Sequence, residues 1–246
     1  MRENAPVGRR LAPGMDGQHE PSGTPAPTGV DVESGAPRSS RPANVAGLGA
    51  PLPAAPREIL LLRHGRTPGN ELHRYNGRTD ESLSAAGRLA LEARAPFPGA
   101  PPPIVYVTPL RRTKETAAIL FPGARQIAVP GLREMDFGDF EGRSYADMEH
   151  DAAYRAWVDG GCLGPIPGGE GRAKFMPRCV AAFRAVLAAD RTDRLVFVIH
   201  GGSIMALCSA LATPKRDYFD WQPPTAGGFL LRTLGARPEL ELVDEV

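Results

Sequence analysis

Long runs of apolar residues mark the strands that this chain is expected to form. Residues 58–64 read EILLLRH, residues 103–109 read PIVYVTP and residues 194–202 read RLVFVIHGG. Such runs are typical of strands whose two faces are both buried in a parallel sheet. Residues 227–234, GGFLLRTL, indicate a last strand, which we expect to be antiparallel and at an edge of the sheet.

Helical segments separate these strands. SAAGRLALEARA indicates a helix capped by Ser84, LRRTKETAAIL a helix over 110–120, and SIMALCSAL a helix over 203–211. Because strands alternate with helices, the pattern predicts a three-layer α/β/α fold with a mostly parallel central sheet. Residues 135–175, rich in glycine and aromatic residues, break this alternation and predict a small insertion over the carboxyl edge of the sheet.

Pro177 interrupts the helical segment GRAKFMPRCVAAFRAVLAA. Proline lacks an amide proton, and its ring clashes with the preceding turn of a helix. We therefore expect either a kink at Pro177 or a helix that begins near residue 175.

Composition separates residues 1–56 from residues 57–246. The first segment holds 10 Pro and 8 Gly and no aromatic residue. It cannot bury enough apolar surface to offset the entropy of ordering, so we expect disorder there and one folded domain over residues 57–246. The 29 basic and 28 acidic residues leave a net charge of +1, which argues against a general nucleic-acid or membrane binder. No apolar run reaches the roughly 20 residues that a membrane span requires.

The three cysteines, Cys162, Cys179 and Cys208, are odd in number and form no C-x-x-C motif. This pattern indicates neither a disulfide framework nor a zinc site. We interpret the cysteines as free thiols in a reducing cytosol. The expectation is a cytoplasmic protein without a metal or another cofactor, and both a monomer and a homodimer remain open.

Polar side chains stand where the predicted strands end. His64 follows the first strand with Arg63 beside it, Arg112 lies just past the second strand, and His200 follows the third. The carboxyl ends of the strands in an open α/β sheet are where ligands bind. Arginine is suited to bidentate recognition of phosphate oxygens. These four residues predict a phosphate pocket that is built without a metal.

An acidic segment, LREMDFGDFEG at residues 132–142, supplies a candidate proton donor. A reaction that expels an alkoxide needs an acid, and a partly buried carboxyl group with a raised pKa can serve. The carboxylates of the segment are Glu134, Asp136, Asp139 and Glu141.

Four motifs occur in one order along the chain: R-H-G-x-T at 63–67, T-P-L-x-R-x-x-E-T-A at 108–117, E-x-x-F-G-x-F-E-G at 134–142 and H-G-G at 200–202. Because all four motifs occur in this order, the chain resembles the histidine phosphatase superfamily over residues 57 to about 234. This superfamily includes the cofactor-dependent phosphoglycerate mutases. The resemblance implies a phosphoglycerate mutase-like fold. It also implies a metal-independent phosphoric monoester hydrolase that works through a phosphohistidine.

The resemblance further implies a role for each matching residue. His64 would be the nucleophile, and Glu134 the acid that protonates the leaving oxygen and later the base toward water. Arg63, Arg112 and His200 would hold the phosphoryl oxygens. The implied substrate-binding residues are Arg63, Thr67, Asn70, Asn76, Gly77, Arg112 and Gly201. Asn76 stands where the family often has glutamine, a difference that concerns the leaving group and not the phosphate.

The neighbours of these residues have plainer interpretations. Arg111 is expected on the helix surface, because the motif register selects the next arginine. Asp136, Asp139 and Glu141 are interpreted as residues that shape the loop.

Segments outside the phosphate site resemble one branch of the family. Trp157 in YRAWVDG and the PGGE segment at 167–170 are similar to the α-ribazole phosphatases, which remove the 5′-phosphate of α-ribazole phosphate late in cobalamin assembly. Trp157 also fits the role of a core aromatic residue. The expected partner is a small phosphorylated metabolite such as α-ribazole 5′-phosphate. The open alternatives are a broad-specificity phosphatase, a phosphoglycerate mutase-like enzyme and a catalytically retired phosphate-binding or interaction module.

Overall fold

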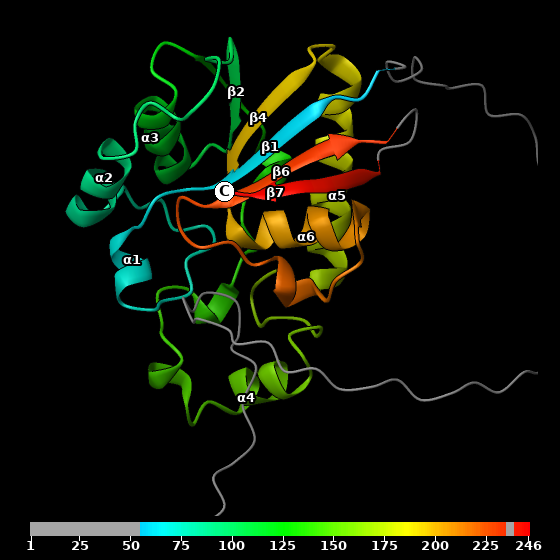
Figure 1. Cartoon of the computed structure of the whole chain (residues 1–246). Coiled ribbons are helices and arrows are strands. Elements are labelled where there is room, and N and C mark those ends of the chain that lie inside the picture. The colour runs from blue at the N-terminus through cyan, green and yellow to red at the C-terminus, as the bar shows by residue number, and fades with distance from the viewer. Residues whose placement is uncertain (1–54, 235–238) are drawn as a thin grey trace, which may run out of the picture.

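The computed structural model describes residues 55–234 and 239–246, which form a seven-stranded sheet with helices on both faces (Figure 1). The strand order is β3-β2-β4-β1-β6-β7-β5. The predicted disorder of residues 1–56 falls almost entirely outside the described residues. No helix in the described part of the chain is long and apolar enough to cross a membrane. The strands are β1 (Glu58–Arg63), β2 (Ile104–Val107), β3 (Arg125–Ala128), β4 (Arg194–Ile199), β5 (Ala212–Thr213), β6 (Gly228–Thr233) and β7 (Leu240–Glu245).

The centre of the sheet is parallel, as the apolar runs predicted. β1 pairs with β4, β4 with β2, and β2 with β3, each in parallel. Arg63 lies opposite Ile199 in the register of β1 and β4. Because both strands end at this pair, His64 and His200 leave the sheet side by side at its carboxyl edge, as parallel pairing requires.

Alternate residues of the central strands belong to two separate apolar clusters, which explains the uninterrupted apolar runs. Leu60 and Leu62 pack in the cluster that contains Leu91 of α2 and Leu120 of α3. Leu61 packs in the cluster that contains residues of α5 and α6. Figure 1 shows α2 and α3 to one side of the sheet and α5 and α6 to the other, so the predicted three-layer fold is confirmed.

The helices follow the predicted segments closely. Ser84 caps α2 by accepting a hydrogen bond from the amide of Gly87, and α3 covers nearly the expected range. The α-helices are α1 (Pro68–Glu71), α2 (Ala85–Glu92), α3 (Arg111–Leu120), α4 (Ala152–Asp159), α5 (Arg172–Ala189) and α6 (Gly201–Leu211). The 3₁₀ turns are η1 (Pro130–Leu132), η2 (Gly138–Phe140), η3 (Ala146–Met148) and η4 (Tyr218–Trp221).

Two boundary predictions were wrong. β6 is antiparallel as expected, but it lies between β1 and β7 and is neither the last strand nor at an edge. β7 escaped prediction because most of its side chains are exposed and it carries no apolar run. α5 begins at Arg172 and not near residue 175, with Pro177 in its second turn, and the predicted kink there stays a prediction.

The insertion between η1 and α5 lies beyond the carboxyl ends of the parallel strands, where Figure 1 shows α4 below the sheet. Aromatic residues join it to the main core: Tyr75, from outside the insertion, contacts Phe137, Tyr154 and Trp157 with ring centroids 5.0–5.9 Å apart. Trp157 is only 4% exposed. Aromatic packing therefore holds this insertion over the edge where His64 and His200 emerge.

Candidate active site

His64 has the protonation state of a nucleophile. Its Nδ1 lies 2.7 Å from the carbonyl oxygen of Gly65. A carbonyl oxygen only accepts, so Nδ1 carries the proton and Nε2 keeps its lone pair. Burial holds the pKa of His64 well below its ordinary value, and the charges of Arg112 and Arg63 lower it further. The imidazole is therefore neutral, with Nε2 available to attack.

His200 lies against His64, with ring centroids 5.2 Å apart, and is fully buried. Its Nδ1 accepts a hydrogen bond from Nε of Arg112 at 3.3 Å, so the proton is on Nε2, which donates to Oγ1 of Thr108 at 2.9 Å. Both ring nitrogens of His200 thus bind protein atoms, and Nδ1 helps to orient Arg112. The expected contact of His200 with phosphoryl oxygens stays a prediction.

Arg112 is fully buried behind the pocket and holds a neighbouring loop in place. Its Nη1 donates to the carbonyl of Thr79 at 2.6 Å, and its Nη2 donates to the carbonyls of Gly77 at 2.8 Å and Asn76 at 3.2 Å. Arg111 is exposed and pairs with Glu115, as a surface residue would. The motif register therefore selected the buried arginine correctly.

Arg63 lines the pocket directly. It is 5% exposed, and its Nη1 donates to the carbonyl of Pro223 at 2.9 Å. Gly201, the first residue of α6, lies close by, because a Cβ built on it would be 3.4 Å from Nε of Arg63. The guanidinium of Arg63 and the first turn of α6 thus place positive charge on the same small space.

Glu134 reaches the first turn of α6 from a remote loop. One carboxylate oxygen accepts from the amide of Gly202 at 2.9 Å, and the other accepts from the amide of Met135 at 2.9 Å. Burial raises the pKa of Glu134, although these amides and the charges of Arg112 and Arg63 oppose the shift. A carboxyl group with this environment retains a proton at higher pH than an exposed one and can act as a general acid.

All three other acids of this segment were expected to shape the loop, and the contacts of two of them agree with this. Glu141 accepts from the amides of Gly77 at 3.0 Å and Arg78 at 2.8 Å, and so holds the loop that Arg112 also binds. Asp136 accepts from the amide of Gly138 at 2.9 Å. No contact of the Asp139 side chain tests its role.

A narrow cavity of about 40 Å³ opens beside His64. Among the predicted residues it is lined by Arg63, His64, Asn70, Asn76, Glu134 and Gly201. Thr67, Gly77, Arg112 and His200 lie behind this lining. Thr67 acts there by capping α1, because its Oγ1 accepts a hydrogen bond from the amide of Asn70 at 3.3 Å.

Several lining residues escaped sequence analysis. Met135 and Phe137 adjoin Glu134, so their place in that motif was an available signal. Tyr218 and Gln222 come from η4 and its end, and no local pattern marks them. The residues missed are Arg74, Tyr75, Met135, Phe137, Gly202, Met205, Tyr218 and Gln222.

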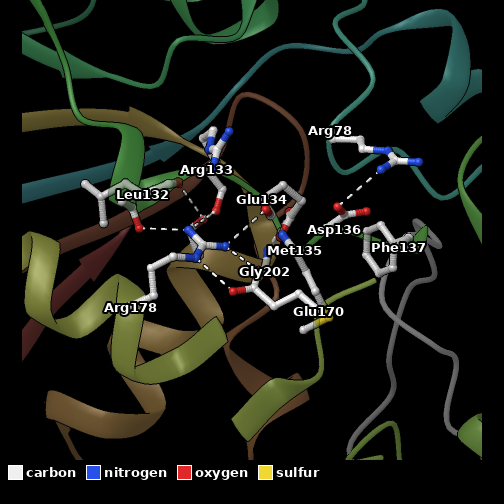
Figure 2. A network of polar contacts seen from close by, with 12 residues as sticks. Arg78, Leu132, Arg133, Glu134, Met135, Asp136, Phe137, Glu170, Arg178 and Gly202 are labelled. Carbon is white, nitrogen blue, oxygen red and sulfur yellow. Dashed lines mark hydrogen bonds and ion pairs between the residues drawn. The ribbon is translucent and has the colours of Figure 1, made fainter. Parts of the chain in front are cut away.

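A second, larger cavity of about 310 Å³ is also lined by Glu134. Figure 2 shows several of its lining side chains around Glu134, including Arg78, Arg133, Glu170 and Arg178. Arg178 donates to the carbonyls of Gly131 and Arg133 and forms an ion pair with Glu170. The two hydrogen bonds to carbonyls hold the loop that carries Glu134 against α5.

Comparison with known proteins gives a consistent assignment. The family model of the histidine phosphatase superfamily (branch 1) matches residues 59–245. Glucosyl-3-phosphoglycerate phosphatase of Mycobacterium tuberculosis is 35% identical over 187 residues, which cover 70% of this chain and 81% of that protein. Phosphoglycerate mutase-like protein 4 of Arabidopsis thaliana is 32% identical over 158 residues, or 61% of this chain and 69% of that protein.

Among solved structures, the α-ribazole phosphatase of Shigella flexneri superposes with a TM-score of 0.66 at 23% identity, covering 76% of this chain and 94% of that chain. At this identity the likeness shows the fold alone. It confirms the mostly parallel, phosphoglycerate mutase-like architecture.

Proposed function

The chain belongs to the histidine phosphatase superfamily, and from this premise we propose that it is a phosphomonoesterase that works through a phosphohistidine. The observation that carries the proposal is the pairing of a neutral His64 with a half-buried Glu134 at one cavity. One group supplies a lone pair and the other a proton, which are the two needs of phosphate ester cleavage.

In the first step, Nε2 of His64 attacks the phosphorus atom while the bond from phosphorus to the ester oxygen breaks. The carboxyl group of Glu134 transfers its proton to the departing oxygen. The guanidinium groups of Arg63 and Arg112 stabilise the charge that spreads over the phosphoryl oxygens. The products of this step are a free alcohol, a phosphohistidine and a Glu134 carboxylate.

In the second step, the Glu134 carboxylate takes a proton from water, and the oxygen of that water attacks the phosphorus atom. The bond from Nε2 to phosphorus breaks and its electrons return to Nε2. Inorganic phosphate leaves, and Glu134 is protonated again. Neither step needs a metal ion or another cofactor.

The substrate proposed from sequence is α-ribazole 5′-phosphate, for cobalamin assembly. Its support in the chain is limited, because the two signals that favoured it have structural explanations. Trp157 packs in the aromatic core of the insertion and does not line the cavity. Glu170 of the PGGE segment forms an ion pair with Arg178.

A second candidate is a phosphorylated glycerate derivative. Its support is the 35% identity with glucosyl-3-phosphoglycerate phosphatase. Both candidates are small phosphorylated metabolites and require the same chemistry at His64. They differ in the leaving group, since only the glycerate derivative carries a carboxylate.

Phosphate release in excess EDTA tests the proposal, with wild type and His64→Ala compared on α-ribazole 5′-phosphate, 3-phosphoglycerate, phosphoserine, a nucleoside monophosphate and an aryl phosphate. We expect turnover by wild type and none by His64→Ala. The ranking of kcat/KM identifies the substrate class. Loss of activity in EDTA contradicts the mechanism, and phosphate binding without any turnover favours a retired phosphate-binding module.

A further inference from the structure

The cavity beside His64 is the smaller of the two cavities that Glu134 borders. Its volume is about 40 Å³, whereas the second cavity measures about 310 Å³. Glu134 lines both. Under the proposed function, Glu134 protonates the oxygen that joins the phosphorus atom to the leaving group, so the leaving group begins at Glu134. The larger cavity therefore lies where the leaving group can extend.

Four basic and three acidic side chains line this larger cavity, which we name the basic cavity. Its lining residues are Arg78, Leu110, Arg133, Glu134, Asp136, Gly169, Glu170, Lys174 and Arg178. Two of the cations are engaged in ion pairs: Arg178 with Glu170, and Arg78 with Asp136 at 3.5 Å. Figure 2 shows both pairs beside Glu134.

Arg133 and Lys174 are the cations left over. Arg133 uses only Nε, which donates to the carbonyl of Pro130 at 3.2 Å. Within the described ranges 55–234 and 239–246, no ion pair joins either residue to a carboxylate. Two unneutralised cations beside a cavity attract an anion, and they are exposed and free to turn toward it.

We propose that the basic cavity binds a carboxylate on the leaving group of the substrate, held by Arg133 and Lys174. The inference rests on the proposed phosphatase function and narrows it to phosphomonoesters whose alcohol part is an acid. Such a leaving group places its ester oxygen at Glu134 and its negative charge at the two cations. A neutral leaving group such as α-ribazole cannot form an ion pair with either cation.

A matched pair of substrates tests this assignment. 3-Phosphoglycerate and glycerol 3-phosphate share the same three-carbon skeleton and phosphate ester, and differ in a carboxylate that is replaced by a hydroxymethyl group. The variant Arg133→Met/Lys174→Met is compared with wild type on both substrates. Lys114→Met is the matched control, because Lys114 is an exposed lysine on α3 that lines neither cavity.

We expect the double variant to lower kcat/KM for 3-phosphoglycerate about tenfold, the effect of losing a hydrogen bond to a charged group. The value for glycerol 3-phosphate should change less than about twofold, and Lys114→Met should change neither. An equal fall on both substrates, or no fall on 3-phosphoglycerate, overturns the proposal.

A binding measurement separates this inference from the proposed function. Titration calorimetry on His64→Ala compares the two compounds with and without the substitutions at Arg133 and Lys174. We expect tighter binding of 3-phosphoglycerate, and loss of that advantage in the triple variant. Equal binding of both compounds to His64→Ala overturns the proposal. If wild type hydrolyses none of the five phosphate esters named above, the phosphatase function fails, and this measurement still decides the role of the basic cavity.

Discussion

Gly202→Ala is expected to remove the general acid while leaving the fold intact. A Cβ built on Gly202 would lie 2.1 Å from Oε1 of Glu134 and 3.0 Å from its carboxyl carbon. Contacts this short are impossible, so the carboxyl group must leave its position beside the first turn of α6. The hydrogen bond from the amide of Gly202 to Glu134, 2.9 Å long, is then lost.

The size of the effect follows from the interactions that are removed. A hydrogen bond to a charged group is worth about 1.5–3 kcal/mol, which corresponds to roughly 10-fold to 150-fold. General acid catalysis as a whole contributes about 10²–10⁴-fold. We therefore expect kcat/KM for an alkyl phosphate to fall about 100-fold. Stability should fall by up to about 2 kcal/mol, because the lost hydrogen bond outweighs the preference of a helix for alanine over glycine, which is about 1 kcal/mol.

The assay measures kcat/KM for a series of phosphate esters whose leaving groups differ in pKa, together with the melting temperature. An aryl phosphate with a good leaving group needs no proton and should lose less than about fivefold. Gly164→Ala is the control, because a Cβ built on Gly164 would meet no heavy atom within 4 Å and Gly164 lines neither cavity. Equal losses on alkyl and aryl esters, or full activity on alkyl esters, would refute the reasoning.

The remaining predictions concern the pocket and the buried charges. Glu134→Gln should reduce alkyl ester hydrolysis far more than aryl ester hydrolysis. The fall of the wild-type kcat at high pH, which the raised pKa of Glu134 sets, should disappear in this variant. An unchanged pH profile contradicts the role of Glu134 as the acid. Arg112→Ala should remove about 3 kcal/mol of transition-state stabilisation and so lower kcat by about 100-fold. A change confined to KM argues against this role of Arg112. Because burial lowers the pKa of both His64 and His200 from 6.5, the unfolded chain binds more protons below that pH, and stability should fall on acidification. Between pH 7 and pH 5, the free energy of unfolding measured with denaturant should fall by up to about 1.4 kcal/mol per pH unit for each histidine. The raised pKa of Glu134 acts in the opposite direction and offsets part of this fall. A free energy of unfolding that does not change with pH refutes the prediction. Arg57→Met should destabilise the fold by about 3 kcal/mol without changing kcat, because this buried arginine donates to the carbonyls of Thr192, Leu187 and Asp190, and an unchanged melting temperature contradicts it.

Local patterns accounted for most of the fold. The apolar runs of β1, β2 and β4 predicted strands buried on two faces, and the two clusters on either side of the sheet explain why alternation is absent. β3, β5 and β7 were missed because they are short or largely exposed. Such short or exposed strands are stabilised by pairing with a neighbour, which leaves little trace in their own composition.

The candidate site was predictable to the extent that its residues share motifs. Arg63 and His64 adjoin one strand end, and His200 follows another, so parallel pairing alone brings them together. Tyr218 and Gln222 were missed because they reach the cavity from η4, and their contact with it depends on how η4 packs against α6.

The sequence by itself determined the parallel sheet, the strand ends that carry Arg63, His64 and His200, and the choice of Arg112 over Arg111. These are consequences of hydrophobic periodicity and motif spacing, which are local properties of a chain. Only the tertiary structure decided that Glu134 contacts the amide of Gly202, 68 residues away, and that Glu134 also borders a second, basic cavity. Contacts between remote segments depend on the packing of whole elements, and no local pattern encodes that packing.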